Sequence, residues 1–304
     1  MSEALTTAPS DGATRPEPEV PVSRKRASAD TGRLLRFLVH RPGLVLSLIL
    51  VTVVLLAVFW PTLLTDRDPL RGTPTEILRP PSTHHWFGTD DLGRDMFARV
   101  VHGAALSLRA TLIAVGVAFV TGSAIGLVAG FGSGWVETAL MRFVDVLLAV
   151  PGLFLSLTVV AALGPGTQNV ALAVGLAGVA GFARVMRAEV LRVRHTVYVE
   201  AARVSGARWY SVLSRHVLPN AAGPVVVLAT LDLGTAVLSV AALGFLGYGA
   251  PPPAPEWGTL IADGRDYLAD AWWVSTLAGL TVAALVLAVN RISRALDGEW
   301  TTGD

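Results

Sequence analysis

The sequence predicts an all-α, polytopic membrane protein with six transmembrane helices and with its N- and C-termini in the cytoplasm. Three observations predict this class: the composition, a series of long charge-free segments, and the placement of the basic residues. Of the 304 residues, 52% are hydrophobic and only 15% are charged. A soluble protein of this length would carry roughly a quarter charged residues, so the composition is typical of a membrane protein.

Charge-free apolar segments give the positions of the spans, because a helix needs about 20 mainly apolar residues to cross a bilayer. One uncharged stretch is too long for a single span, and the turn-forming residues 164–169 divide it into two. Pro151, followed by Gly152, is expected to kink the third span because proline removes a backbone donor and clashes with the preceding turn. The expected spans are 42–64, 110–136, 146–183 (two spans), 221–249 and 271–289.

The basic residues orient these spans, because cytoplasmic loops carry an excess of Lys and Arg. With the N-terminus inside, the inner segments hold most of the 24 basic residues, and the outer loop 248–270 is acidic. The polar segment 187–219 is therefore expected in the cytoplasm and the loop 65–104 outside the cell. We expect the chain in the cell membrane as a multi-pass protein in contact with the lipid bilayer.

Outside the spans, the sequence predicts two tails. Residues 1–32 are rich in Pro, Ser, Thr, Ala and Glu without apolar periodicity, which is typical of a disordered tail. A cleaved signal peptide is the competing interpretation, but the tail is too long and the apolar stretch too extended. The domain organisation is thus a cytoplasmic tail 1–32, a transmembrane domain 33–297 and a C-terminal tail 298–304.

Several function classes are disfavoured by what the sequence lacks. It has no cysteine, which excludes disulfides and thiolate metal sites. Its single lysine, Lys25, lies between two arginines and not in a P-loop, so any ATP must be bound by another polypeptide. The basic residues form separated clusters, which do not predict a nucleic-acid partner. The histidines show no metal-binding spacing beyond the adjacent His84-His85, and we expect no catalytic residue, metal or cofactor.

Glycines in the second span predict close helix packing. Gly122, Gly126 and Gly130 are four residues apart, and Gly116 precedes them by one and a half turns. Glycines at this spacing lie on one helix face and allow another helix to approach closely. The spans should therefore form a compact bundle.

The cytoplasmic segment has the pattern of a helix, a glycine turn and a second helix. Residues 196–203 suit a short helix, and Gly206 is a natural helix end. Residues 209–217 repeat at helical spacing, and Pro219 is expected to stop this second helix and begin the fifth span. A docking surface for a soluble partner and an interfacial helix on lipid headgroups both fit this pattern, and Glu200 alone could be a helix-start acid.

The residues of this segment resemble a known motif. Glu200-Ala201-Ala202, then Gly206 after three residues, then Leu218-Pro219, resemble the EAA loop of bacterial ABC importer permeases. In that family the loop forms coupling helices in a cleft of the cytoplasmic ATPase subunit. The resemblance implies the type I ABC importer permease fold and assigns the ATPase contact to Glu200, Ala201, Ala202, Gly206, Leu218 and Pro219. One departure is His216, where the family often has an aliphatic residue, although the peptide-importing branch tolerates histidine there.

Two further stretches narrow the branch. Residues 85–95, HWFGTDDLGRD, look like the signature before the second span of C-type permeases in dipeptide, oligopeptide and nickel importers. The stretches GFLG at 244–247 and PPPAPEWG at 251–258 match the same branch. In physical terms, residues 89–93 are turn-rich, and the apolar residues between 96 and 101 suggest a short interfacial helix before the second span.

The resemblance implies a permease subunit that forms half of the translocation pathway for di- or oligopeptides. Its implied partners are a homologous permease subunit in a heterodimer, cytoplasmic ATP-binding subunits and an extracytoplasmic substrate-binding protein. The same role for nickel or another small solute remains open. An ion-coupled secondary transporter would need several intramembrane acids or repeated broken helices, and a membrane enzyme would need a nucleophile–base set that the sequence does not show.

Asp232 is a carboxylate that lies deep within the expected fifth span. Members of the branch often carry Glu a few residues before Phe-Leu-Gly, but Val240 occupies that place here. A carboxylate inside a span is costly and is therefore a functional candidate by default. It could line the translocation pathway, find a partner inside the heterodimer interface, or be protonated.

Overall fold

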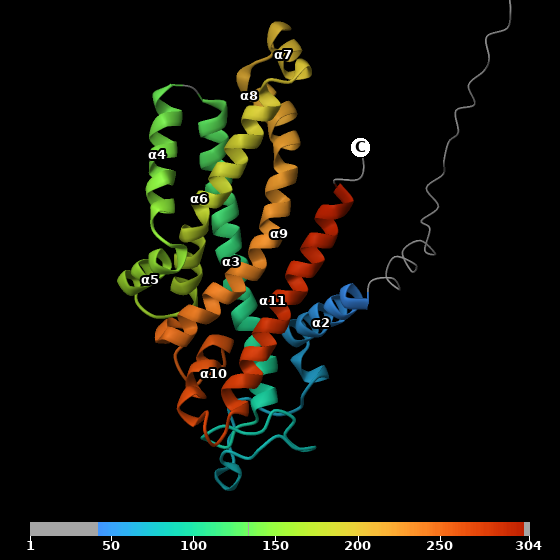
Figure 1. The fold of residues 1–304 in the computed structure, drawn as a ribbon, viewed down its shortest axis with the longest axis vertical. Coiled ribbons are helices and arrows are strands. Elements are labelled where there is room, and N and C mark those ends of the chain that lie inside the picture. Colours follow the sequence, from blue (N-terminus) through green and yellow to red (C-terminus); the bar gives the residue numbers. More distant parts are fainter. Residues whose placement is uncertain (1–41, 133, 301–304) are drawn as a thin grey trace, which may run out of the picture. The chain divides into compact units, whose positions relative to one another are not determined.

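The computed structural model describes residues 42–132 and 134–300, of which residues 296–300 are described by backbone alone. The expected disordered tail 1–32 lies outside the described residues. Within them, the regular structure is helical apart from two isolated β-bridges. The α-helices (Figure 1) are α2 Pro42–Phe59, α3 Met96–Phe131, α4 Trp135–Ala149, α5 Gly152–Leu163, α6 Thr167–Arg194, α7 Val197–Val204, α8 Trp209–Val212, α9 Leu218–Leu243, α10 Trp257–Asp263 and α11 Trp273–Trp300.

Five helical stretches of the described chain are long and apolar enough to cross a membrane, and a bent pair raises the number to six. That pair is α4 and α5, which are too short to cross singly and meet at an angle of 94°. Val150 is extended at the bend, and Pro151 precedes α5. The expected interruption at Pro151 is confirmed, and it is a break in the helix. The expected break at residues 164–169 is also confirmed, because α5 ends at Leu163 and α6 begins at Thr167.

The long helices α3 and α6 lie side by side through the bundle (Figure 1), and glycines of α3 set their separation. A Cβ atom on Gly122 would lie 2.5 Å from the Val179 carbonyl oxygen, and one on Gly130 would lie 2.8 Å from Val190 Cβ. Gly126 is equally close to α6, at the Ala183 carbonyl oxygen. The predicted close packing is confirmed at these three positions. Gly116 is not part of it, since nothing lies within 4 Å of its Cβ position.

The expectation of a separate interfacial helix before the second span is wrong. Residues from Met96 onward are the first turns of α3, so the expected loop 65–104 ends at Asp95. The Asp95 carboxylate accepts a hydrogen bond from the Ala98 N–H at 2.8 Å and begins the helix there. Met96 and Val100 are buried in one core with residues of α10 and α11. The first turns of α3 are therefore stabilised by contacts with α10 and α11, and the helix begins before its uncharged apolar segment.

Pro219 lies in the first turn of α9, as expected, but the expectation that it stops the second cytoplasmic helix is wrong. From Trp209 to Tyr248 the chain is one continuous helical stretch of 40 residues. A π-helical turn, η3 (Leu213–Val217), precedes Pro219, and the Leu218 N–H donates to the Leu213 carbonyl. The wider turn displaces the carbonyl that a proline ring would otherwise meet, so the helix continues. A second π-helical segment, η4 (Gly244–Tyr248), ends the stretch.

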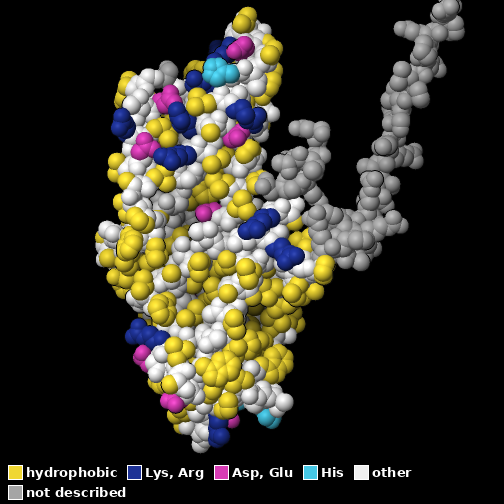
Figure 2. Space-filling view, viewed as in Figure 1, with side chains coloured by type: hydrophobic (Ala, Val, Ile, Leu, Met, Phe, Trp, Pro, Cys, Tyr) yellow, Lys and Arg dark blue, Asp and Glu magenta, His cyan; other side chains and the backbone are white. Residues whose placement is uncertain are grey.

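The polar parts gather at two opposite ends of the described helices. Figure 1 shows α7 and α8 at one end, and α10 with the loop between α2 and α3 at the other. Hydrophobic side chains cover much of the visible middle of the molecule in Figure 2, whereas charged side chains are more frequent toward both ends. This is the distribution expected when a lipid bilayer surrounds the middle. At the C-terminal end α11 continues to Trp300, so the expected tail 298–304 begins as helix.

Candidate functional site

The helix α7 presents two different faces. Val199 is fully buried and Ala202 is half-buried, so both face the bundle. On the opposite face Val197 is 83% exposed and Val204 is 89% exposed. Glu200 and Ala201 are exposed between them. Two of the residues expected to contact an ATPase therefore lie on the outward face of the helix.

Gly206 makes the turn that follows α7. Its φ is +80°, a conformation that residues with a Cβ rarely adopt. Its N–H donates to the Arg203 carbonyl at 3.0 Å, and the Ala207 N–H donates to the Ala202 carbonyl at 3.1 Å. Nothing surrounds the Cβ position of Gly206, so the backbone conformation alone requires glycine. The predicted short helix and glycine turn are both confirmed.

Contacts of aromatic rings stabilise the turn at Gly206 against the helical bundle. The Arg203 guanidinium lies 5.5 Å from the ring centroid of Phe131, at the end of α3, and the Trp209 ring lies 6.5 Å from the same ring. The ring of Tyr198 in α7 lies 6.4 Å from that of His216 in η3. His216, which departs from the family pattern, thus packs the two helices of the segment against each other.

The exposed tip of this segment has the chemistry of a protein-docking surface. We call the outward residues Val197, Glu200, Ala201, Val204 and Trp209 the α7 face. Val197, Val204 and Trp209 are large apolar side chains exposed at the polar end of the molecule, and exposed apolar patches of this kind mark interaction sites.

An interfacial helix would need arginines that meet lipid phosphates, and two arginines of this segment, Arg192 and Arg194, instead make contacts within the protein. Arg192 binds Glu189 at 2.6 Å, and Arg194 donates to the Gly130 carbonyl at 2.8 Å. These contacts favour the docking interpretation over the lipid-surface one.

Leu218 and Pro219 lie elsewhere. Both are exposed at the start of α9. They follow Trp209 by nine and ten residues, which is roughly 14–15 Å along a helix that rises 1.5 Å per residue. The structure therefore brings Glu200, Ala201, Ala202 and Gly206 together and leaves Leu218 and Pro219 lower on the adjoining helix.

Asp232 is half-buried on α9 and faces α6. Its Oδ2 atom lies 3.8 Å from the Cβ position of Gly178. In the described part of the chain it has neither an ion pair nor a side-chain hydrogen bond. Val240, which replaces the expected glutamate, is buried in the core between α3, α6 and α9.

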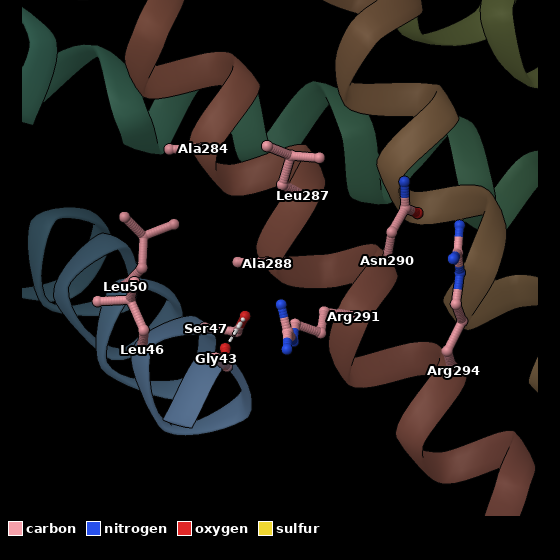
Figure 3. A pocket seen from close by; sticks show the side chains of 10 residues that line it. All are labelled: Gly43, Leu46, Ser47, Leu50, Ala284, Leu287, Ala288, Asn290, Arg291 and Arg294. Atoms are coloured by element: carbon pink, nitrogen blue, oxygen red, sulfur yellow. Dashed lines mark hydrogen bonds between the residues drawn. The ribbon is translucent and has the colours of Figure 1, made fainter. Parts of the chain in front are cut away.

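A cavity of about 600 Å³ lies between α2 and α11 (Figure 3), and none of the predicted site residues lines it. The Arg291 side chain reaches from α11 to Gly43 of α2, where a Cβ atom would meet its guanidinium. Arg291 thereby bridges the first and last helices of the bundle. No group of three His, Cys, Asp or Glu side chains that could hold a metal ion occurs in residues 42–132 and 134–300.

The stretch 85–95 forms a buried ionic network at the other end of the molecule. Asp90 is 3% exposed; its Oδ1 accepts from the backbone N–H groups of Leu92 and Arg94 at 3.0 and 2.8 Å. Its Oδ2 lies 2.6 Å from Arg94 Nε and 3.6 Å from Arg99 Nε. Asp90 thus binds its own loop to the first turns of α3.

Asp95 is the second carboxylate of this network. Besides capping α3, it binds the Arg67 guanidinium at 2.9 Å and the His85 ring at 2.8 Å. The Trp273 indole N–H donates to the Thr89 carbonyl at 3.2 Å, which joins the loop to α11. From the sequence, the stretch 85–95 was interpreted only as a family marker, and its ion pairs were not predicted. The alternation of Asp and Arg in a turn-rich stretch is the feature that could have predicted them.

Glu256 is a buried carboxylate that the sequence reasoning did not single out as a site. It is 1% exposed and precedes α10; its Oε2 accepts the Ala250 N–H at 2.8 Å, and its Oε1 has no partner among the described residues. The carboxylate lies against Gly244 and Gly249. Burial raises the pKa of the Glu256 carboxyl above its ordinary 4.5, and the Ala250 N–H opposes this effect. The only sequence feature that could have indicated a buried carboxylate here is a single acid among glycines and prolines.

The raised pKa of Glu256 predicts a pH-dependent stability. The folded state holds this proton more tightly than the unfolded state, so the stability of the wild type should fall as pH rises above about 4.5 through the raised pKa. Glu256→Gln has no proton to lose and keeps an oxygen for the Ala250 N–H. Its melting temperature minus that of the wild type should therefore grow between pH 4.5 and 8, measured in detergent. A difference that stays constant over this window would contradict the buried-acid assignment.

The helical bundle, with its five or six candidate spans, defines a polytopic α-helical membrane protein. The chain belongs to the family described as binding-protein-dependent transport system inner membrane components, whose pattern matches residues 122–301. It is therefore a multi-pass subunit of the inner membrane with a transport role and without catalysis of its own.

Relatives support this over most of the chain. The dipeptide transport system permease protein DppC of Alkalihalophilus pseudofirmus is 40% identical over 83% of both chains. The probable D,D-dipeptide transport system permease protein DdpC of Escherichia coli is 36% identical, over 88% of this chain and 90% of the relative. The glutathione transport system permease protein GsiD of Pectobacterium atrosepticum is 39% identical over 71% of this chain and 72% of the relative.

Solved structures show the same fold at lower identity. A chain of the MetNI methionine ABC transporter in an inward-facing conformation is 22% identical with a TM-score of 0.52, covering 66% of this chain and 97% of that one. A chain of an amino acid ABC transporter has a TM-score of 0.53 at 14% identity, over 67% of this chain and 94% of that chain. The helical arrangement is thus that of ABC importer permeases.

Proposed function

We propose that this chain forms half of the translocation pathway of an ABC importer for di- or oligopeptides. The observation that carries the proposal is the outward α7 face, with Glu200 and Ala201 exposed among large apolar side chains. The peptide substrate is supported by the dipeptide permeases that resemble the chain at 36–40% identity. Energy would come from separate ATP-binding subunits, since the sequence has no P-loop of its own.

The proposed topology has six spans, with α4 and α5 together as the third and both termini in the cytoplasm. The hydrophobic middle of Figure 2 supports a bilayer around the helices. The arginines of the segment 184–219 support a cytoplasmic α7. The loop between α2 and α3 would then face the extracytoplasmic binding protein, and a homologous permease subunit would complete the pathway.

Coupling would use the helices that flank the α7 face. α7 follows α6 after a short connection, and α8 continues without interruption into η3 and α9. A continuous helix transmits displacement of one end along its axis. Closure of the ATPase on the α7 face would therefore move α6 and α9 together. Leu218 and Pro219 lie on this connection, at the wider π-helical turn.

Asp232 is proposed to line the pathway. It lies half-buried where α9 packs on α6, the two helices that coupling would move. A carboxylate there would meet a passing peptide as the helices shift relative to each other. Its lack of a side-chain hydrogen bond among the described residues supports this role.

Co-purification with the ATPase tests the docking proposal. Glu200→Lys inverts a charge at the centre of the α7 face without touching the buried Val199 side. ATPase retention by the assembled transporter should fall at least about tenfold, which corresponds to about 1.4 kcal/mol. Pull-down of the ATPase subunits from detergent-solubilised membranes measures this.

Asp232→Asn serves as the matched second variant. It should retain the ATPase like the wild type and lower peptide uptake in proteoliposomes. The docking claim fails if the wild type retains no ATPase or if Glu200→Lys retains as much as the wild type. Unchanged uptake by Asp232→Asn would remove Asp232 from the pathway without affecting the docking claim.

A further inference from the structure

A second and larger cavity, of about 950 Å³, lies at the end of the molecule opposite α7. It is formed by the loop before α3, the η4 segment with its following prolines, and α10. Its volume falls within the roughly 300–1,000 Å³ of small-molecule sites. The lining combines an apolar wall, which includes Phe245, Leu246 and Pro251, with both signs of charge from Arg99, Asp263 and Asp266.

Arg99 is a buried cation whose own partners are distant. It is 3% exposed, yet Asp90 Oδ2 lies 3.6 Å from its Nε and Asp263 Oδ2 lies 3.9 Å from its Nη2. The contact of Nη1 with the Pro69 carbonyl is 3.4 Å long, and Nε has no hydrogen-bond partner among the described residues. A guanidinium carries five donors and prefers a close, bidentate carboxylate.

Asp90 does not fill this role for Arg99. Its oxygens already accept from Arg94 Nε at 2.6 Å and from two backbone N–H groups. Moving Asp90 toward Arg99 would break these bonds. Nε is enclosed and lies nearest Asp90, so the donors left for a ligand are those of Nη2, whose neighbouring carboxylate oxygen, Asp263 Oδ2, is 3.9 Å away. Arg99 lines the cavity, and a carboxylate that arrives through it would supply a closer acceptor for Nη2.

Asp263 lies beside this cation, and Asp266, which binds Arg265 at 3.2 Å, lines the same cavity. The side chain of Asp263 is 49% exposed and that of Asp266 is 75% exposed. Desolvation raises the pKa of the Asp263 carboxyl above its usual range, and Arg99 partly offsets this. A cationic group placed near Asp263 would stabilise its charged form, as Arg99 does from the other side.

We propose that this cavity binds a zwitterionic peptide, with its α-carboxylate on Arg99 and its α-ammonium group on Asp263 and Asp266. The apolar wall of Phe245 and Leu246 would receive the peptide side chains. The site would hold the peptide between its release from the binding protein and its passage through the spans. This inference rests on the proposed function and deepens it, since it names the termini as the recognised groups.

Direct binding of three related probes tests the site. The full transporter is placed in nanodiscs without any binding protein, and Ala-Ala, Ala-Ala-amide and N-acetyl-Ala-Ala are titrated by saturation-transfer NMR. The wild type should bind Ala-Ala at least about tenfold more tightly than either blocked peptide, because each block removes one charged contact.

Two variants assign the two ends of the peptide. Arg99→Gln should abolish the preference for Ala-Ala over the amide and keep the preference over the N-acetyl peptide. Asp263→Asn should do the reverse. These ratios are internal to each variant, so partial loss of folded protein leaves them unchanged. Arg79→Gln, at an exposed arginine outside the cavity, is the matched control and should leave both ratios as in the wild type.

The proposal is overturned if the wild type binds all three peptides alike. It is equally overturned if the Arg99 and Asp263 variants change affinity for the binding protein and leave both ratios intact, which would make the cavity a protein contact. Retention of the ATPase is measured on the same preparation. If the transporter retains the ATPase but shows no preference for Ala-Ala over the blocked peptides, only the peptide-site inference is wrong. If it shows the preference but does not retain the ATPase, the docking proposal is wrong.

Discussion

Asp90→Ala is expected to destabilise the protein by about 3–5 kcal/mol, the usual cost of removing one partner from a buried ion pair. Asp90 and Arg99 are each 3% exposed, and Arg94 is 8% exposed. The substitution leaves the buried Arg94 guanidinium without the carboxylate that it binds at 2.6 Å, and it removes the charge that lies 3.6 Å from Arg99 Nε. It also frees the backbone N–H groups of Leu92 and Arg94. The loop should detach from α3, and thermal unfolding in detergent should show a markedly lower melting temperature.

Asp66→Ala is the control for this prediction. Asp66 is an exposed acid of the same loop, and a surface substitution of this kind usually changes stability by less than about 0.5 kcal/mol. Asp90→Asn should fall between the two, because its amide oxygen can still accept the backbone N–H groups. Equal melting temperatures for Asp90→Ala and Asp66→Ala would show that the ionic network does not hold the loop.

The elements predicted well from the sequence are those with a local physical cause. Pro151 lacks the backbone N–H that would continue α4, and the chain bends there by 94°. Gly206 follows a run of helix formers and takes the positive φ that ends α7. The four-residue spacing of Gly122, Gly126 and Gly130 places all three against α6. The first two signals lie within a few residues of their consequences, and the third needs only a face of α3 that lets another helix approach closely.

The elements predicted poorly depend on contacts that the sequence does not display. The absence of charge marks where a helix meets lipid but not where the helix ends, so α3 begins 14 residues before the expected start at residue 110. Pro219 is compatible with a continuous helix only because a π-helical turn precedes it. Arg99 has Asp263 as a neighbour from far along the chain, and Glu256 is enclosed by the fold of its own preceding loop, in which Ala250 donates to it.

The difference between local signals and long-range contacts explains which part of the candidate site could be predicted from the sequence. The α7 face is a local helix with a local turn, and its residues could be assigned from one short segment. The cavity beside Arg99 joins three separate segments, including Arg99 of α3 and Asp263 of α10. The stretches 85–95, 244–247 and 251–258 all contribute to its lining, but only their folding together produces a guanidinium and carboxylates around one cavity, so the sequence marks the stretches and not the cavity.

Gly122→Ala is expected to destabilise the packing of α3 on α6. The added Cβ would lie 2.5 Å from the Val179 carbonyl oxygen, a backbone atom that cannot rotate away. The helices must separate or bend, and overpacking of this kind typically costs 1–3 kcal/mol. The thermal midpoint in detergent should fall accordingly. Peptide uptake should fall as well, because α6 leads into α7 and positions the α7 face.

Gly116→Ala is the matched control on the same helix. Nothing lies within 4 Å of its Cβ position, so the substitution adds no clash and gains up to about 1 kcal/mol of helix propensity. The two variants make the same chemical change six residues apart, and only one of them meets α6. Opposite shifts in melting temperature would therefore attribute the effect to the helix contact. Similar shifts for both would mean that helix propensity alone governs these glycines and that α3 and α6 are not held at this separation.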